Sequence, residues 1–286
     1  MIKKIFIFSL ALLTLSFFVS AKKSIALDKD VVPDSYIVVL KDGVASPAVV
    51  ASEMASQHGL SVAFVYSHAL KGFAATIPSA RLTSLKKDPR VLFISQDRVV
   101  ATSRKPVPTP TPSPAPQETP TGILRIGSAV NTGAGIGVAV IDTGIDLDHP
   151  DLVDNVVAGY SCVRRNTTGN DDNGHGSHVA GTIAAANNSI GVVGVAREAK
   201  LYAVKVLDSR GSGTWSSVIC GIDYVTANAA NIKVANMSLG GGGNSDNNCG
   251  ITNSDALHKA ICASRDAGVT YVVAAGNETD NASNHV

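Results

Sequence analysis

Hydrophobic and polar residues follow different patterns in two blocks of the chain. In the first block, residues 34–101, short apolar runs predict strands, and two segments between them repeat apolar residues at helical spacing. The strands are expected at 35–40, 61–67, 72–78 and 91–97, and the helices at 46–59 and 79–89. This order of elements is typical of a small α+β domain of the ferredoxin-like type.

The second block, residues 122–286, alternates long apolar runs with amphipathic segments. Strands are expected at 136–142, 200–207, 233–240 and 269–276, and helices at 175–186, 215–229 and 254–267. The strand runs are apolar at consecutive positions, as in strands that helices cover on both faces. The block therefore predicts an α/β fold with a parallel sheet flanked by helices.

A proline-rich segment separates the two blocks. The stretch "KPVPTPTPSPAPQETP" occupies residues 105–120. Because alternating prolines favour extended polyproline geometry, we expect residues 102–121 to form a semi-rigid, exposed linker. Such a segment is also an accessible site for proteolysis.

The first 21 residues have the pattern of a secretory signal peptide. A basic start, "MIKK", precedes the apolar run "IFIFSLALLTLSFF", and "VSA" offers a cleavage site after Ala21. A membrane anchor is the alternative, but the apolar run is shorter than the about 20 residues that span a bilayer. We therefore expect a secreted, extracellular protein with no stable membrane anchor after cleavage.

Export permits disulfides, and the cysteines are Cys162, Cys220, Cys249 and Cys262. Four cysteines allow three pairings. The bridge Cys249–Cys262 is favoured because these two are nearest in sequence, and buried free thiols remain the alternative.

Two classes of function find little support in the sequence. The net charge of +1, with no run of Lys or Arg, gives no electrostatic basis for binding nucleic acid. The motif "HGSHVAGTIAA", residues 175–185, contains His175 and His178. A zinc metalloprotease helix carries histidines four residues apart beside a glutamate, whereas these are three apart with no glutamate nearby. Zinc binding by this pair is therefore disfavoured.

His175 is instead a candidate general base. His178 suits a buried packing position, whereas His175 lies at the predicted helix start. Asp142 follows a buried strand and could orient the imidazole, and Asn277 follows another strand and could donate to an oxyanion. The alternatives are an Asx turn at Asp142 and a simple turn at Asn277. Because carboxyl ends of parallel strands share one edge, the residues together favour a site.

Four ordered segments resemble blocks of the subtilisin-like serine proteases, the subtilase or S8 peptidase family. They are "VAVIDTGIDLDHPDL" (138–152), "HGSHVAGTIAA" (175–185), "NMSLGG" (236–241) and "VVAAGN" (272–277). The first block is similar to the I9-type inhibitory propeptide of that family. The resemblance implies a secreted endopeptidase precursor that acts on protein or peptide substrates, with its own propeptide as inhibitor and folding aid.

The resemblance also implies roles for individual residues. Asp142 would orient His175, and Asn277 would stabilise the oxyanion. Two facing backbone edges would hold an extended substrate, one formed by Ser238, Leu239 and Gly240 and the other by Gly211, Ser212 and Gly213. For the second edge, a flexible loop is the alternative.

The segment "AANNSIGV", residues 185–192, resembles the calcium loop of the same family, and this resemblance implies a calcium site. Hard oxygen ligands on a flexible loop suit Ca²⁺. The implied ligands are the side chains of Gln117, Asp151 and Asn188 and the carbonyls of Ala186, Ile190 and Val192.

The family's Gly-Thr-Ser-Met-Ala block, which carries the nucleophilic serine, does not occur in the 286 residues. We interpret the chain as a precursor cut short before that block, with an incomplete sheet and, as it stands, no peptidase activity. The alternative is a catalytically inactive peptide-binding or inhibitory module. Because Asp142, His175 and Asn277 all match the family pattern, the first interpretation is favoured.

Overall fold

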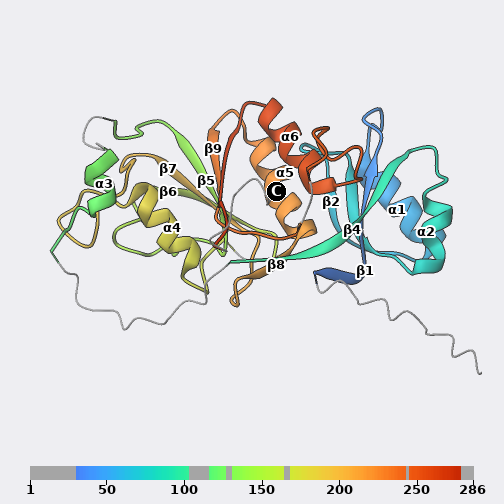
Figure 1. Cartoon of the computed structure of the whole chain (residues 1–286), viewed down its shortest axis with the longest axis horizontal. Helices are drawn as coiled ribbons and strands as arrows, with labels where there is room; N and C mark the ends of the chain where they lie inside the picture. The colour runs from blue at the N-terminus through green and yellow to red at the C-terminus, as the bar shows by residue number, and fades with distance from the viewer. Residues whose placement is uncertain (1–29, 103–115, 127–130, 164–167, 243–244, 278–286) are drawn as a thin grey trace, which may run out of the picture.

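The structure, a computed structural model, describes residues 30–102, 116–126, 131–163, 168–242 and 245–277 (Figure 1). The predicted signal peptide and most of the predicted linker lie outside these ranges. Among the described residues, no helix has the length and apolar character needed to cross a bilayer. Figure 1 shows an N-terminal sheet and a C-terminal sheet, with α5 and α6 between them.

The N-terminal domain has the expected order of elements. They are β1 (Val31–Leu40), α1 (Pro47–His58), β2 (Ser61–Tyr66), β3 (Gly72–Thr76), α2 (Ser79–Leu85) and β4 (Val91–Ala101). The strands lie in the order β2-β3-β1-β4 and pair antiparallel. Strand β1 is apolar at consecutive positions because both faces are buried. Val38 and Leu40 pack into the core with α1, whereas Ile37 and Val39 join a core shared with the other domain.

The C-terminal domain contains the predicted parallel sheet. Its strands are β5 (Gly137–Asp142), β6 (Val156–Ser161), β7 (Lys200–Lys205), β9 (Ile232–Met237) and β10 (Thr270–Val273), and its long helices are α4 (His175–Ala184), α5 (Trp215–Ala227) and α6 (Ala256–Asp266). The order is β10-β9-β5-β7-β6, and every pair is parallel.

Helices cover both faces of the central strand β5. Val138 and Val140 pack in a cluster with residues of α4, whereas Ala139 and Ile141 pack in a cluster with residues of α5. Successive side chains of a strand point to opposite faces, so a strand between two helical layers is apolar throughout. The predicted α/β fold preceded by an α+β domain is confirmed.

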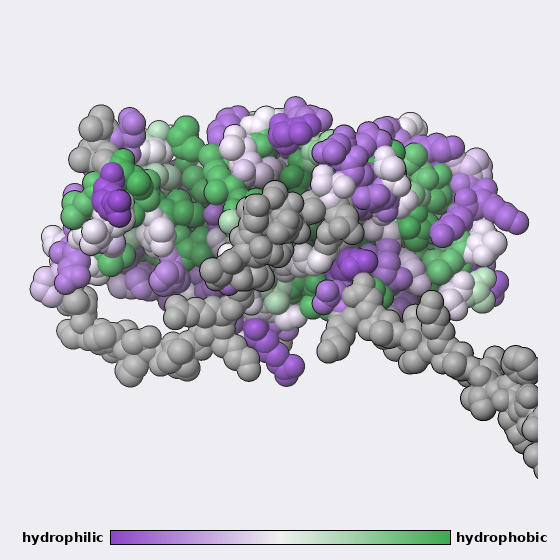
Figure 2. Space-filling model, in the orientation of Figure 1, coloured by the Kyte–Doolittle hydropathy of each residue, from purple (hydrophilic) through white to green (hydrophobic). Residues whose placement is uncertain are grey.

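Three elements were not predicted: β6, β8 (Ser212–Thr214) and α3 (Thr121–Ile126). Only Ile123 of α3 is buried, while Leu124 and Ile126 are exposed. Figure 2 shows hydrophobic residues over the end of the molecule near α3 and over the α1 end, with hydrophilic residues over α6 between them. Helix α3 was not predicted because six residues, of which one is buried, have little hydrophobic periodicity.

Two disulfides join the four cysteines. Cys249 pairs with Cys262, which was the favoured bridge, and Cys162 pairs with Cys220. The second bridge links the segment after β6 to α5, two elements far apart in sequence. The structure leaves no free cysteine, so the alternative of buried thiols is wrong.

Candidate active site

A buried carboxylate and a histidine meet at the carboxyl edge of the C-terminal sheet. Asp142 is the last residue of β5 and is fully buried, and His175 is the first residue of α4. Nδ1 of His175 lies 2.8 Å from Oδ1 of Asp142. Oδ1 also accepts the backbone N–H of Thr143 at 2.7 Å. A carboxylate that accepts from Nδ1 fixes the imidazole tautomer and leaves Nε2 for proton transfer.

Asp171 organises the first turn of α4 and thereby positions His175. The N-cap residue, Gly174, has a φ of 102° and no side chain that could cap the helix. Oδ1 of Asp171 accepts the N–H of Gly174 at 3.0 Å, and Oδ2 accepts the N–H and the hydroxyl of Ser177 at 3.0 and 2.6 Å. A carboxylate here satisfies free N–H groups and interacts favourably with the helix dipole.

The glycine that follows His175 lets α4 approach the end of β5 directly. A side chain at Gly176 would collide with the backbone oxygen of Gly144. The N–H of Gly176 donates to Oγ1 of Thr143 at 2.9 Å. Any larger residue at 176 would push His175 away from Asp142.

The environment of His175 favours its charged form. The hydrogen bond to Asp142 raises the pKa of His175 above 6.5, partial burial opposes this, and the charges of Asp142 and Asp171 raise it further. His175 is therefore a neutral base only above this raised pKa. Because the folded-state pKa lies above the unfolded value, the stability that this pair adds is full below about pH 6.5 and is lost as pH rises through the raised pKa.

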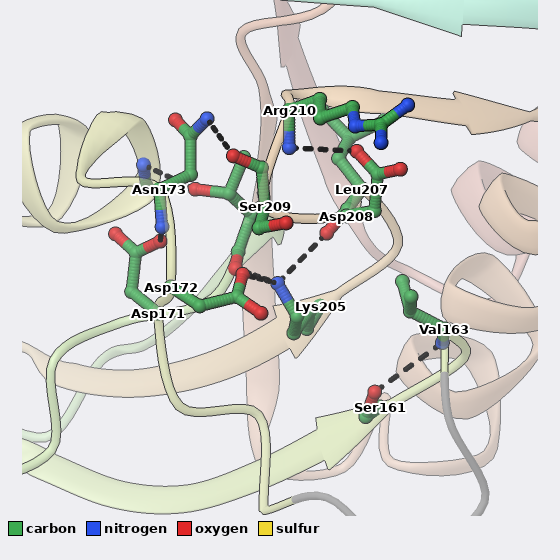
Figure 3. Close-up of polar contacts among 12 residues, drawn as sticks. Ser161, Val163, Asp171, Asp172, Asn173, Lys205, Leu207, Asp208, Ser209 and Arg210 are labelled. Atoms are coloured by element: carbon green, nitrogen blue, oxygen red, sulfur yellow. Dashed lines mark hydrogen bonds and ion pairs between the residues drawn. The ribbon is translucent and has the colours of Figure 1, made fainter. Parts of the chain in front are cut away.

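A buried lysine joins the Asp142 loop to the next loop of the same edge (Figure 3). Lys205, the last residue of β7, is 3% exposed and lies beside Asp142 in the sheet register. Its Nζ donates to the carbonyls of Thr143 and Leu207 at 2.6 and 2.9 Å and to Oδ1 of Asp172 at 2.6 Å. Three acceptors satisfy the ammonium, as burial of a charge requires. The cation thus holds the residue after Asp142 against the segment that leads into β8.

The other two polar residues of the histidine motif have different surroundings. His178 is exposed, so the interpretation of His178 as a buried packing residue is wrong. The reason is helical geometry: the buried residues of α4 are Gly176, Ala180 and Ala184, and position 178 lies on the opposite side of the helix. The hydroxyl of Ser177 donates to Asp171 and accepts the N–H of Asp146 at 2.8 Å. These contacts make Ser177 part of the helix cap.

Asn277 lies beyond β10 at the same carboxyl edge as Asp142. Strand β10 ends at Val273 and is parallel to β9, which is parallel to β5. The side chain of Asn277 is exposed. An exposed amide at this edge can donate hydrogen bonds to a bound molecule.

The two predicted substrate edges are brought together by a strand of the N-terminal domain. Residues Val99, Val100 and Ala101 of β4 pair antiparallel with Thr214, Gly213 and Ser212 of β8. On its other side, Ala101 exchanges two backbone hydrogen bonds of 3.1 Å with Gly240. Ser238 and Leu239 immediately precede Gly240 on that segment. The end of β4 therefore fills the groove between the edges as a third strand.

The groove leads toward His175. The N–H of Thr102 donates to the carbonyl of Gly211 at 2.9 Å, so the chain continues along the β8 side after Ala101. Asn173 lies next to this point: its side chain donates to the Ser209 carbonyl at 3.0 Å and accepts the N–H of His175 at 3.2 Å. Figure 3 shows Asn173 extended toward Ser209. The filled groove and the histidine therefore share a wall.

Two carboxylates that the sequence analysis missed fasten the domains together. Asp97 of β4 is 1% exposed and accepts the N–H and the hydroxyl of Ser216, in the first turn of α5, at 3.0 and 2.7 Å. Asp223 of α5 accepts the backbone N–H groups of Ser67, His68 and Ala69 of the N-terminal domain at 2.7–3.2 Å. The domains thus exchange charge-assisted hydrogen bonds.

The predicted calcium ligands lie together at the loop after α4. Nε2 of Gln117 is 2.8 Å from the carbonyl oxygen of Ala186, 3.4 Å from Oδ1 of Asn188 and 3.3 Å from the carbonyl oxygen of Ile190. Oδ2 of Asp151 accepts the N–H of Val192 at 2.9 Å. Oδ1 of Asp151 is buried and has no hydrogen-bond partner within the described part of the chain.

These contacts fit a cation that binds oxygen. The oxygens of Ala186, Asn188 and Ile190 surround the side-chain amide of Gln117. Rotation of this amide by 180° would replace its nitrogen with a fourth oxygen. Clusters of three or more His, Cys, Asp and Glu side chains are absent from the described ranges. A site built here would therefore use carbonyl and amide oxygens with one carboxylate, a ligand set that suits Ca²⁺.

Comparison with known proteins gives two family matches. The model of the subtilase family matches residues 133–286, and that of the peptidase inhibitor I9 family matches residues 35–103. Subtilisin E of Bacillus subtilis (strain 168) is 38% identical over 290 residues, covering 98% of this chain and 69% of that protein. The extracellular serine proteinase of Thermus sp. (strain Rt41A) is 36% identical over 275 residues, covering 88% and 63%. The cuticle-degrading protease of Metarhizium anisopliae is 35% identical over 271 residues, covering 90% and 63%.

Proposed function

This chain belongs to the subtilase family, and we propose that it is the precursor of a secreted serine endopeptidase that cleaves peptide bonds in protein substrates. The observation that carries the proposal is the position of β4. The end of this strand pairs with both edges of a groove that shares a wall with His175, the partner of the buried Asp142. An enzyme that acts on extended peptides needs such a groove, since backbone hydrogen bonds hold any sequence in register.

In the proposed mechanism, each residue of the site has one task. His175 takes the proton of the nucleophile and then delivers it to the leaving amine, while Asp142 keeps Nδ1 protonated and stabilises the imidazolium. Asn277 donates to the oxyanion of the tetrahedral intermediate. Backbone groups of Gly211, Ser212, Gly213, Ser238, Leu239 and Gly240 hold the substrate.

We place the nucleophile in sequence that follows Val286. No Gly-Thr-Ser block occurs in residues 1–286, and this chain covers 69% of the length of subtilisin E. A serine is required because acyl transfer through the Asp142–His175 pair needs an attacking hydroxyl. A polypeptide limited to residues 22–286 is therefore expected to be inactive.

We assign the chain to four segments. Residues 1–21 are the signal peptide, 34–101 the I9-type propeptide, 102–121 the linker and 122–286 the peptidase domain as far as it extends here. The two disulfides support export, because such bonds persist in oxidising compartments. The relative from Thermus sp. is, by its name, an extracellular enzyme.

The propeptide is proposed to inhibit the enzyme by occupying the groove as a cleaved product would. We expect the isolated segment 34–101 to inhibit the mature enzyme, and its Asp97→Ala variant to inhibit about 10- to 100-fold less well. The reason is that Asp97 accepts two hydrogen bonds from Ser216, and hydrogen bonds to a charged group contribute about 1.5–3 kcal/mol. The measurement is the inhibition constant against a peptide substrate.

Glu53→Gln is the matched control for this experiment. Glu53 is an acidic residue of α1 whose ion pair is with Arg90 of the same domain. This variant should inhibit as well as the unmodified segment. Absence of inhibition by the unmodified segment at high micromolar concentration would contradict the proposed inhibitory role.

We also propose that the loop 185–192 binds a structural Ca²⁺. Gln117, Asp151, Asn188 and the carbonyls of Ala186, Ile190 and Val192 would hold it. The unpartnered Oδ1 of Asp151 supports the proposal, since a buried carboxylate oxygen requires a cation or a donor. The bound ion would tie residues 116–118, which pair with this loop through Pro116–Ile190 and Glu118–Val192 bridges, to the peptidase domain.

Removal of calcium is expected to destabilise the folded protein. A ligand held only by the native state adds about 2.7 kcal/mol at a concentration 100 times its dissociation constant. EDTA should therefore lower the melting temperature, and Asn188→Ala should remove most of the EDTA effect. Asn187 is the exposed neighbour of Asn188, and Asn187→Ala serves as the control, which should keep the full effect of EDTA on the melting temperature. An unchanged melting temperature on adding EDTA to the unmodified protein would contradict this ligand assignment.

A further inference from the structure

A pocket lies where the propeptide strand meets the peptidase domain, next to the filled groove. Its volume is about 450 Å³, and it is lined on the propeptide side by residues that include Arg98. The peptidase side consists of Trp215, Asn253, Ser254 and Asp255. Nothing in the proposed catalytic mechanism uses this pocket.

The backbone register places Arg98 at the position that an extended substrate would occupy. Val99 pairs with Thr214, so Arg98 comes one residue before the three that pair with β8. The guanidinium carbon of Arg98 lies 5.6 Å from the centre of the Trp215 ring. This is within the range of cation–π attraction, for which tryptophan is the strongest aromatic partner.

The peptidase side of the pocket also carries negative charge. Asp255 is 6% exposed, and its Oδ1 caps α6 by accepting the N–H of His258 at 3.0 Å. A carboxylate in a confined pocket attracts a cation more strongly than one in open solvent. Together, Trp215 and Asp255 form a wall that favours a positively charged side chain.

That wall is held in a fixed shape. The loop that supplies Asn253 and Ser254 is bridged to α6 by the Cys249–Cys262 disulfide. Desolvation raises the pKa of Asp246, but hydrogen bonds from the backbone N–H groups of Asn248, Gly250, Asn253 and Thr252 outweigh this and lower it to about 2. The carboxylate of Asp246 accepts these N–H groups at 2.8–3.1 Å, and the hydrogen bonds hold the loop in place.

We propose that the Trp215–Asp255 pocket is a subsite that selects substrates with a basic side chain one residue before the three that pair with Ser212–Thr214. The inference rests on the proposed function, because it treats Arg98 as the stand-in for a substrate residue. When the propeptide leaves, Arg98 leaves with it, and Trp215 and Asp255 remain on the peptidase side of the pocket. The subsite would add a preference for a positively charged side chain to a groove that otherwise binds the substrate through its backbone.

The first test compares two peptide substrates of the complete, activated enzyme, identical except for Arg or citrulline at this position. Citrulline has the shape of Arg without its charge. We expect kcat/KM to be about three- to tenfold higher for the Arg peptide, mainly through KM. Trp215→Leu should abolish the preference. Asp255→Asn should reduce it, and because Asn is an equally good helix cap the fold should be retained.

Tyr224→Leu is the matched control, since it removes an aromatic residue of the same helix that stacks on Tyr160 instead. It should leave the Arg preference unchanged. Equal kcat/KM for the two peptides with the unmodified enzyme would overturn the proposal, and so would a preference that survives Trp215→Leu. In both cases the proposed function would still hold, because the enzyme hydrolyses the peptides.

The second test needs no hydrolysis. In the chain 22–286, a double-mutant cycle of Arg98→Gln and Trp215→Leu measures their coupling in the unfolding equilibrium. We expect the pair to be coupled by about a factor of three to ten. Additive effects would show that Trp215 does not bind the cation and would overturn the proposal, whether or not the enzyme is active. If the pair is coupled here but the complete, activated enzyme hydrolyses no peptide, the proposed function alone would be contradicted.

Discussion

Replacement of His175 by Ala in the complete enzyme is expected to lower kcat by about 10⁶-fold, the loss measured for the catalytic histidine of subtilisin itself, a member of the same family. The structural reason is that His175 is paired with a buried carboxylate through Nδ1, so that only Nε2 can exchange a proton with the reacting groups. Without the imidazole, the nucleophile has no base, and the leaving amine has no acid. The measurement is kcat with a peptide substrate for the variant and the unmodified enzyme.

The histidine motif contains its own control for this experiment. His178 lies on the same helix, three residues later, and its side chain is exposed. His178→Ala should therefore leave kcat and KM unchanged within about twofold, since exposed substitutions away from a site have small effects. A large loss of kcat in His178→Ala with His175→Ala active would mean that the base has been assigned to the wrong histidine.

Asp142→Asn is expected to lower kcat by about 10⁴-fold and to shift the pH profile. The size of the effect is that seen when the same change is made in serine proteases, where the amide stabilises the wrong imidazole tautomer. Because the Asp142 hydrogen bond raises the pKa of His175, the acid limb of kcat/KM should lie above pH 6.5 in the unmodified enzyme. In Asp142→Asn, which lacks the carboxylate that favours the charged imidazole, the acid limb of kcat/KM should move to lower pH.

The measurement is kcat/KM from about pH 5 to 9 for both proteins, which spans the ordinary pKa of histidine. Asp148→Asn, a substitution of an exposed carboxylate six residues away, serves as the control and should keep both the rate and the limb. A limb that stays in place in Asp142→Asn would show that the ionisation in the rate profile does not belong to His175.

The sequence was most informative where local pattern and chemistry coincide. An apolar strand that ends in a carboxylate placed Asp142 at the edge of the sheet, and the Gly-rich start of α4 placed His175 there as well. Both the strand bounds and the helix start agree with the structure to within one residue. The end of β5 and the start of α4 are set by residues close together in sequence, and hydrophobic periodicity reports such local structure directly.

The contacts between the domains were beyond such reasoning. Strand β4 continues to Ala101, four residues further than predicted, because its last residues gain β8 as a partner from the other domain. Strand β8 itself has only three residues and forms on that pairing. The contact of Asp97 could have been inferred in part from the sequence. In the alternation of β4, Asp97 lies on the same buried face as Ser95, and a buried carboxylate requires a specific hydrogen-bond donor.

The most direct test of the account is to label the nucleophile. The complete reading frame and the segment 22–286 are each treated with a fluorophosphonate, which reacts with an activated serine, and the labelled residue is identified by mass spectrometry. We predict that the complete, matured enzyme takes one label, on a serine encoded after Val286, and that Asp142→Asn labels far more slowly. The segment 22–286 should take none. A label on Ser177 or Ser238, or no label on a complete enzyme freed of its propeptide, would contradict the account and favour a peptide-binding module without peptidase activity.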